Sequence, residues 1–371
     1  DRIEDNYNFI LNVEKQNAKI AELGKTITNQ QLIYLQEDSS TLIYVKYNFT
    51  ENMSTQKIIY RFFNDLDEYR LFFNQYDNFL DFYHDMLPDG KWGKKLDGFV
   101  FRGESTEDYK LLPAALRKSF YDYNCSGMYY PNDKLPFDKI CENIQVTNEL
   151  NLLIKFYDKA NKCGLKFPII HDFLSCSENN FGNMLRAWIK YSRWIPKELV
   201  ELIALAQHHG IPTRLLDWTL DINIALYFAS LNSCKKKNIH DNIVVWAIKY
   251  QYASNDFFEY PLKFIMPPYH ENGNLNSQKG ILSYWEINTD IKDINNKYSN
   301  VVDRTPLDIL IKDYPIIVLY KFKIPSNEAE YIFTYISKLG YTSSRLFPGY
   351  DGVVKEIQEE TYMHSEFLKN R

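Results

Sequence analysis

Residues 204–229 read ALAQHHGIPTRLLDWTLDINIALYFA and place several structural elements in a short stretch. The first residues continue a helical pattern of apolar positions that starts at Leu199, and Gly210-Ile211-Pro212 ends it, because glycine and proline interrupt helices. Residues 213–216 can form a strand, and residues 223–230 have the apolar spacing of a second helix. The stretch is therefore predicted to fold as helix, turn, strand and helix.

Upstream of this stretch, the short apolar run Phe99-Val100-Phe101 is closed by Arg102-Gly103. A short apolar run with polar neighbours is consistent with a buried strand, and an arginine at its end is placed to point toward a ligand. Apolar side chains at helical spacing predict helices over residues 65–85, 137–163 and 181–194, and a further helix that begins at Pro196.

Downstream, strand patterns become more frequent. Residues 243–250 and 316–324 are strong strand candidates, residues 262–266 and 275–285 are weaker ones, and residues 327–339 have helical spacing. A chain that is rich in helices first and in strands later is typical of the α+β class.

The N-terminal residues follow a separate pattern. Residues 5–24 have the apolar spacing of a helix that Gly24 ends, and residues 41–49 alternate as a strand does. We expect residues 1–62 to form an N-terminal accessory unit and residues 63–371 to form the main domain.

Composition excludes several classes of protein. The net charge of −5 at pH 7 argues against a broad basic face for duplex DNA. The five cysteines include no C-x-x-C pair, so no disulfide framework and no metal site is expected, and a reducing compartment fits best. No apolar run approaches the roughly 20 residues that span a bilayer, and the first residues lack a secretory pattern. We expect a cytoplasmic protein without membrane contact.

Arg102 and Gly103 are the first candidate site residues. Arginine offers a planar, permanently charged fork that suits phosphate or carboxylate, and glycine lets a ligand approach the backbone closely. These properties suit a diphosphate or a nicotinamide ribose. The structural alternative is a buried ion pair of Arg102 with Glu149 or Asp217.

The Gln207–Thr219 region holds further candidates. His208 and His209 can act as acid, base or donor, although either one can instead have a structural hydrogen-bonding role. Asp217-Trp218-Thr219 offers a carboxylate, an aromatic plane and a hydroxyl at a strand end, but Asp217 could equally cap the following helix. Arg214 is interpreted as an ion-pair partner of Asp217.

Three segments in order resemble the FRG domain family, which takes its name from a Phe-Arg-Gly tripeptide. The first is FVFRGESTEDYKLLPAAL at residues 99–116, with the tripeptide at 101–103 and Leu112-Pro113-Ala114 behind it. Glu149 resembles the family's glutamate, and residues 204–229 form the third and most specific segment. The resemblance covers about residues 65–285 and implies an accessory or effector component of bacteria and phages, with a toxin or anti-phage defence role.

The order of motifs also resembles that of ADP-ribosyltransferases. In that pattern an aromatic-Arg-Gly ends a first strand, as at residues 101–103, and a later strand ends in a hydroxyl motif before an Ala-x-x-Phe-Ala helix. Residues 216–219 and 225–229 match this second element, with Asp-Trp-Thr in place of Ser-Thr-Ser. Residues 277–280, Ser-Gln-Lys-Gly, resemble the third, a glutamine two residues before a catalytic glutamate.

One departure bears on activity, because position 280 is glycine where the transferase pattern has that glutamate. The requirement is a carboxylate near the ribose rather than a particular sequence position, so Asp217 or Glu149 could substitute. Asp351 is a further candidate, although its surroundings are also typical of a turn. The run FLSCS at residues 173–177 superficially resembles the hydroxyl motif but lacks the following helix.

The resemblance implies an α+β fold with a split, mainly antiparallel sheet like that of ADP-ribosyltransferases, with NAD as the substrate. The implied activity is transfer of ADP-ribose to an unknown protein or nucleic-acid acceptor, or cleavage of NAD, with a possible partner protein from a defence or toxin-antitoxin system. The implied catalytic residues are Arg102, Glu149, His208 and Asp217. The implied NAD-binding residues are Arg102, Gly103, His209, Thr219, Tyr227 and Gln278. The alternative is a non-catalytic module that binds a nucleotide or nucleic acid.

Overall fold

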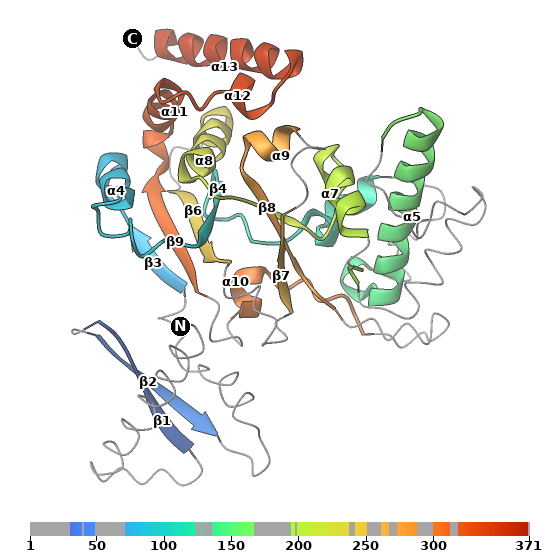
Figure 1. Cartoon of the computed structure of the whole chain (residues 1–371), viewed down its shortest axis with the longest axis horizontal. Coiled ribbons are helices and arrows are strands. Elements are labelled where there is room, and N and C mark those ends of the chain that lie inside the picture. The colour runs from blue at the N-terminus through green and yellow to red at the C-terminus, as the bar shows by residue number, and fades with distance from the viewer. Residues whose placement is uncertain are drawn as a thin grey trace. The chain divides into compact units, whose positions relative to one another are not determined.

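The structure is a computed structural model, and Figure 1 shows its course. It describes residues 30–38, 41–48, 71–123, 128, 136–166, 194–196, 199–236, 242–250, 261–266, 273–287, 300–311 and 318–369. Two compact units divide the chain: one contains residues 1–74 and 307–321, and the other contains residues 75–306 and 322–371.

The N-terminal part of the first unit contains a β-hairpin. Strand β1 (Gln30–Asp38) pairs antiparallel with β2 (Thr41–Asn48), and Tyr34 lies opposite Tyr44. The predicted strand over residues 41–49 is confirmed, whereas β1 was not predicted. The expected helix over residues 5–24 and the expected boundary after residue 62 lie outside the described residues, so both stay predictions.

A seven-stranded sheet has the order β3-β9-β6-β4-β5-β8-β7. Its strands are β3 (Leu71–Gln75), β4 (Phe99–Glu104), β5 (Leu216–Thr219), β6 (Asn242–Lys249), β7 (Leu262–Ile265), β8 (Gly280–Trp285) and β9 (Leu319–Pro325). The pairs β4–β5, β4–β6, β5–β8 and β7–β8 are antiparallel. The expected α+β class with a mainly antiparallel sheet is therefore confirmed.

The described helices account for most of the predicted helical segments. The α-helices are α4 (Phe79–Met86), α5 (Glu142–Lys162), α7 (Val200–His208), α8 (Ile222–Lys236), α9 (Gly273–Ser277), α10 (Leu307–Leu310), α11 (Ala329–Lys338), α12 (Ser343–Leu346) and α13 (Tyr350–Lys369). Short 3₁₀ segments are η1 (Ala114–Leu116), η2 (Lys118–Asp122), η3 (Phe137–Lys139) and η9 (Ser326–Glu328). Of the predicted helix over residues 181–194, only Trp194 is described, so that prediction is not tested.

One predicted helix, over residues 65–85, is wrong in part. Residues 71–75 form strand β3, and within the described residues 71–85 the helix begins at Phe79 of α4. Asn78 defines the start of α4, because its side-chain oxygen accepts a 2.9 Å hydrogen bond from the backbone N–H of Asp81. The aromatic residues of the Leu-Phe-Phe run suit a strand as well as a helix, and periodicity alone does not separate the two.

Helix α8 packs against one face of β4. Its apolar side chains point in several directions, and Ile224, Ala225, Leu226 and Ala229 are all buried. A helix that is apolar all round belongs inside the protein. A second core joins α5 and α7 to β8 through residues such as Leu153, Leu202 and Leu282. These two packings fix the positions of β4, β5 and the end of α7, which carry the candidate site.

No helix among the described residues is long and apolar enough to cross a membrane.

Candidate functional site

Arg102 of β4 lies beside Asp217 of β5. Its Nε donates a 2.7 Å hydrogen bond to Oε1 of Glu104, and its Nη1 donates a 2.9 Å hydrogen bond to the backbone carbonyl of Asp217. The same nitrogen lies 3.9 Å from the Asp217 carboxylate. Burial lowers the pKa of Arg102, but the charges of Glu104 and Asp217 outweigh this effect and raise it, so the guanidinium stays charged.

The Asp217 carboxylate is held in place and still reaches solvent. Gln207, in the last turn of α7, donates a 2.6 Å hydrogen bond from Nε2 to Oδ1 of Asp217. The Thr213 hydroxyl donates in turn to Oε1 of the Gln207 side chain, and this bond fixes the orientation of the side-chain amide. The Asp217 side chain is nevertheless 67% exposed. A carboxylate with one oriented oxygen and open access is suited to meet a ligand.

The end of α7 also brings His208 toward Asp217. The rings of His208 and His209 lie edge to face, with centroids 5.2 Å apart, and His209 stacks on Phe156. Burial lowers the pKa of His208 below 6.5, the charge of His209 lowers it further, and Asp217 opposes both effects. A neutral imidazole near neutral pH is able to accept a proton. We call Arg102, Glu104, Gln207, His208 and Asp217 the Arg102–Asp217 cluster.

Glu149 does not join this cluster. It is buried and accepts hydrogen bonds from Nε of Arg214 at 2.8 and 3.0 Å, and from Trp194 at 2.7 Å. Glu142 also pairs with Arg214. The interpretation of Arg214 as an ion-pair partner of Asp217 is therefore wrong, because Arg214 is engaged with two other carboxylates. The expected catalytic role of Glu149 has no support here, since its oxygens are fully engaged in the core.

Gly103 has a packing role. A Cβ atom at this position would lie 1.8 Å from the backbone oxygen of Ala225 and 3.0 Å from Cβ of Ala229. Helix α8 thus approaches β4 so closely that no side chain fits between them. We expected a ligand to lie close to the Gly103 backbone, but on this face helix α8 lies there.

Thr219 and Gln278 connect neighbouring strands. Thr219 lies opposite Gly280 in the β5–β8 pair, and its hydroxyl donates a 2.7 Å hydrogen bond to the backbone carbonyl of Gln278. The Gln278 amide donates to the backbone oxygen of Leu346 at 3.2 Å. The three motifs therefore lie on the adjacent strands β4 and β5 and at the start of β8. At that start, Gly280 contributes no carboxylate.

Tyr227 lies in the core. Its side chain is fully buried, and its hydroxyl bonds Ser343 at 2.6 Å and a carboxylate oxygen of Glu359 at 2.9 Å. Burial and the charge of Glu359 raise the pKa of Tyr227 far above its usual value. The implied NAD contact of Tyr227 has no support in this geometry, because its hydroxyl joins α8 to α12 and α13.

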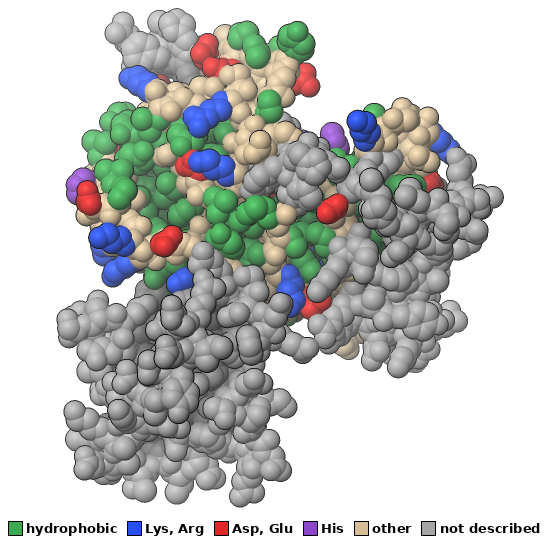
Figure 2. Space-filling view, viewed as in Figure 1, with side chains coloured by type: hydrophobic (Ala, Val, Ile, Leu, Met, Phe, Trp, Pro, Cys, Tyr) green, Lys and Arg blue, Asp and Glu red, His purple; other side chains and the backbone are tan. Residues whose placement is uncertain are grey.

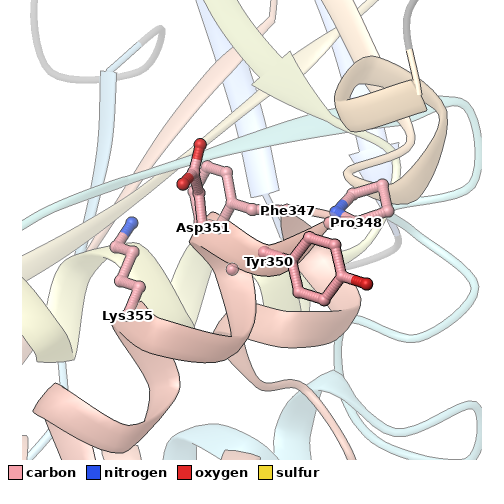
Figure 3. Close-up of a pocket in the computed structure, with 7 residues that line it drawn as sticks. Phe347, Pro348, Tyr350, Asp351 and Lys355 are labelled. Atoms are coloured by element: carbon pink, nitrogen blue, oxygen red, sulfur yellow. The ribbon is translucent and has the colours of Figure 1, made fainter.

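Asp351 lies at the start of helix α13, where the sequence indicated a loop turn as the alternative to a site. It lines a cavity of about 370 Å³ whose other lining residues are Phe347, Pro348, Gly349, Tyr350, Gly352 and Lys355. In Figure 3 the side chains of Asp351 and Lys355 project from the same edge of α13, and Tyr350 points away from them. No residue of the Arg102–Asp217 cluster lines this cavity.

Sequence reasoning named Arg102, His208 and Asp217 of the cluster but missed Glu104 and Gln207. Both lie next to named residues: Glu104 is two positions beyond Arg102 on the same strand, and Gln207 begins the Gln-His-His-Gly run. Alternation along a strand puts residues two apart on one face, which is the signal that could have identified Glu104. Gln207 has no comparable sequence signal, because its role depends on the turn that brings Asp217 back to α7.

Among the described residues, no group of His, Cys, Asp and Glu could hold a metal ion.

Comparison with known proteins gives one family. Residues 97–238 match the FRG domain, a range that contains β4, α5, α7, β5 and α8 and the whole Arg102–Asp217 cluster. No curated protein and no solved structure matches the chain. The chain therefore carries an FRG domain, and its candidate functional site lies inside that domain.

Proposed function

We propose that the protein is an NAD-dependent ADP-ribosyltransferase or an NAD-cleaving enzyme with the Arg102–Asp217 cluster as its active site. The observation that carries this proposal is the Asp217 carboxylate, which is open to solvent, oriented by Gln207 at 2.6 Å and 3.9 Å from a permanently charged guanidinium. A cation and an accessible carboxylate side by side suit a substrate that carries a diphosphate next to a ribose.

Arg102 supplies the phosphate contact in this proposal. Its Nε and Nη1 are bonded to Glu104 and to the Asp217 backbone, so the guanidinium plane is fixed before a ligand arrives. Within the described part of the chain, no acceptor bonds its Nη2. A preorganised guanidinium with remaining donors binds a phosphate at low entropic cost.

Asp217 takes the place of the carboxylate that position 280 lacks. When the bond between ribose C1′ and the nicotinamide nitrogen breaks, nicotinamide leaves with the bonding electrons and positive charge develops on the ribose. A fixed carboxylate stabilises that charge. Water or an acceptor hydroxyl then attacks C1′, and neutral His208 accepts the proton that the nucleophile loses.

The order of the strands supports the same reading. Residues near 102, 218 and 279 are far apart in the chain, yet they meet on the neighbours β4, β5 and β8, as the resemblance to ADP-ribosyltransferases implies. An effector function in bacterial toxicity or anti-phage defence rests on the FRG resemblance alone.

A binding module without catalysis is the second candidate. Gly280 favours it, because position 280 has no carboxylate. The Thr219 hydroxyl and the Gln278 side-chain amide also donate to backbone oxygens of the protein itself. In that case the cluster holds a nucleotide or a nucleic-acid end by its phosphate, and Asp217 contacts a sugar hydroxyl.

Labelled NAD separates the two candidates. The purified protein is incubated with NAD labelled in the adenosine part, with and without cell lysate, beside Arg102→Ala of verified fold. Release of nicotinamide or transfer of label by the wild type alone supports the enzyme. Saturable NAD binding without turnover supports the binding module, and absence of both contradicts the NAD proposal.

A further inference from the structure

Helix α13 carries its apolar side chains on the outside. Tyr350 is 92% exposed, and Val353, Val354 and Ile357 are 47%, 53% and 57% exposed. These four residues have the spacing i, i+3, i+4 and i+7, which places them on one side of a helix. We call them the α13 stripe. Figure 2 shows hydrophobic side chains on the outer side of this helix.

The side of α13 that faces the protein is polar. Glu359 is buried against Tyr227 and Ser343, the backbone N–H of Ser344 donates a 2.9 Å hydrogen bond to Glu356, and Tyr362 donates to the Cys234 carbonyl at 2.9 Å. A helix on the surface of a globular protein normally turns its apolar stripe toward the core. In α13 the arrangement is reversed, and specific hydrogen bonds hold the stripe toward solvent.

The close contact at Gly352 fixes this orientation further. A Cβ atom there would lie 1.8 Å from the backbone oxygen of Phe347 and 3.0 Å from that of Ser343. Only glycine allows the first turn of α13 to lie against the chain in this way. The helix is thus locked in the orientation that exposes the stripe.

Charges beside the α13 stripe are acidic. On the part of α13 whose side chains are described, the exposed charged residues are Asp351 and Glu360. Lys355 is half-buried and lies over the Phe347 ring, 3.7 Å from its centroid. A partner surface complementary to the stripe therefore needs apolar side chains with basic residues at its edges.

We propose that the α13 stripe is a docking surface for an amphipathic helix of a partner protein whose flanks are basic. Apolar residues of the partner pack on Val353, Val354 and Ile357, and its Lys or Arg side chains pair with Asp351 and Glu360.

The same charges argue against two other occupants. In a parallel pair of α13 helices, the flank with Asp351 faces the flank of the second copy that carries Glu356 and Glu360, and in an antiparallel pair the flank with Glu356 and Glu360 faces the same flank of the second copy. Both arrangements place like charges together, which costs free energy. An anionic lipid surface attracts helices with Lys and Arg beside the apolar face, and on the part of α13 whose side chains are described no Lys or Arg is in the exposed class.

Two synthetic helical peptides test the proposal with the full chain. Both have leucine at i, i+3, i+4 and i+7; one has Lys and Arg on its flanks, and the other has Glu. Fluorescence anisotropy measures the binding of each to the wild type, to Val354→Ser/Ile357→Ser, and to Asp351→Lys/Glu360→Lys. Leu80→Ser, at an apolar residue of α4 that is 52% exposed, is the matched control. All these substitutions are at exposed positions, so the unfolding midpoint should not move.

We expect saturable binding of the basic peptide to the wild type and to Leu80→Ser, and binding at least about tenfold weaker to the serine double variant. The charge-reversed variant should prefer the acidic peptide, which no purely apolar association predicts. Equal binding of both peptides, or binding that survives the serine substitutions, would overturn the proposal. So would a wild-type dimer that the serine substitutions dissociate, or binding to anionic phosphatidylserine vesicles in place of the basic peptide.

Discussion

The Nη1 group of Arg102 donates a 2.9 Å hydrogen bond to the backbone carbonyl of Asp217, across 115 residues of sequence. This bond joins the Phe-Arg-Gly motif on β4 to the Asp-Trp-Thr motif on β5. Because the carbonyl and the carboxylate belong to the same residue, Arg102 both orients the Asp217 backbone and places a positive charge 3.9 Å from its side chain. The two motifs are therefore held together in one site.

The close approach of α8 to β4 makes Gly103 sensitive to any side chain. Gly103→Ala should lower the free energy of unfolding by about 3 kcal/mol or prevent folding, because a Cβ atom there would clash with the Ala225 backbone. Urea denaturation measures the effect. Gly273→Ala is the control, since the nearest atom to its added Cβ lies at 3.6 Å, an ordinary contact. Equal stability of the two variants would show that α8 does not lie where the structure has it.

The buried pair of Glu149 and Arg214 is expected to matter for stability. Glu149→Ala leaves the Arg214 charge with only Glu142 and removes a partner from Trp194, so unfolding should become easier by about 3–5 kcal/mol. Glu201→Ala, an exposed glutamate of α7, should have little effect. If Glu149→Ala kept wild-type stability and lost turnover, Glu149 would be catalytic and the structural interpretation would be wrong.

His208 predicts a dependence of stability on pH. Its pKa is lower in the folded protein than the ordinary 6.5, mainly through burial, so between these two values the unfolded chain holds more protons. The free energy of unfolding then rises with pH across this window: the contribution is complete above about 6.5 and is lost as pH falls toward the folded value. Urea midpoints from about pH 5 to 7 should rise more steeply for the wild type than for His208→Gln. Equal slopes for the wild type and His208→Gln would contradict this account.

The elements around the site could largely be predicted from sequence. The helix-turn-strand-helix order of residues 204–229 is correct, although the strand falls at Leu216–Thr219 and not at residues 213–216. The shift has a physical reason: Thr213 and Arg214 use their side chains to bond Gln207 and Glu149, which lie elsewhere in the fold. Local patterns carry no information about such partners.

The roles of individual residues were harder to predict for the same reason. Tyr227 looks like a ligand contact in a motif, yet its hydroxyl partner Glu359 lies 132 residues away on α13. Glu149 and Arg214 were each matched with the wrong charge, because the pairing depends on how α5 packs on α7. Arg102 and Asp217 could be named because each is a charged residue directly after a short apolar run. In the structure Arg102 lies within β4 and Asp217 within β5, and the antiparallel pairing of these strands brings the two residues together.

Nicotinamide release by Asp217→Asn tests the central claim most directly. The substitution keeps the size of the side chain and removes the charge that would stabilise the developing positive ribose, so release should fall by roughly 10²–10³-fold while the unfolding midpoint stays close to the wild type. Asp122→Asn, the same change at an exposed residue of η2, should release nicotinamide at the wild-type rate. Release that is equal in Asp217→Asn and the wild type would contradict the assignment of Asp217 as the catalytic carboxylate.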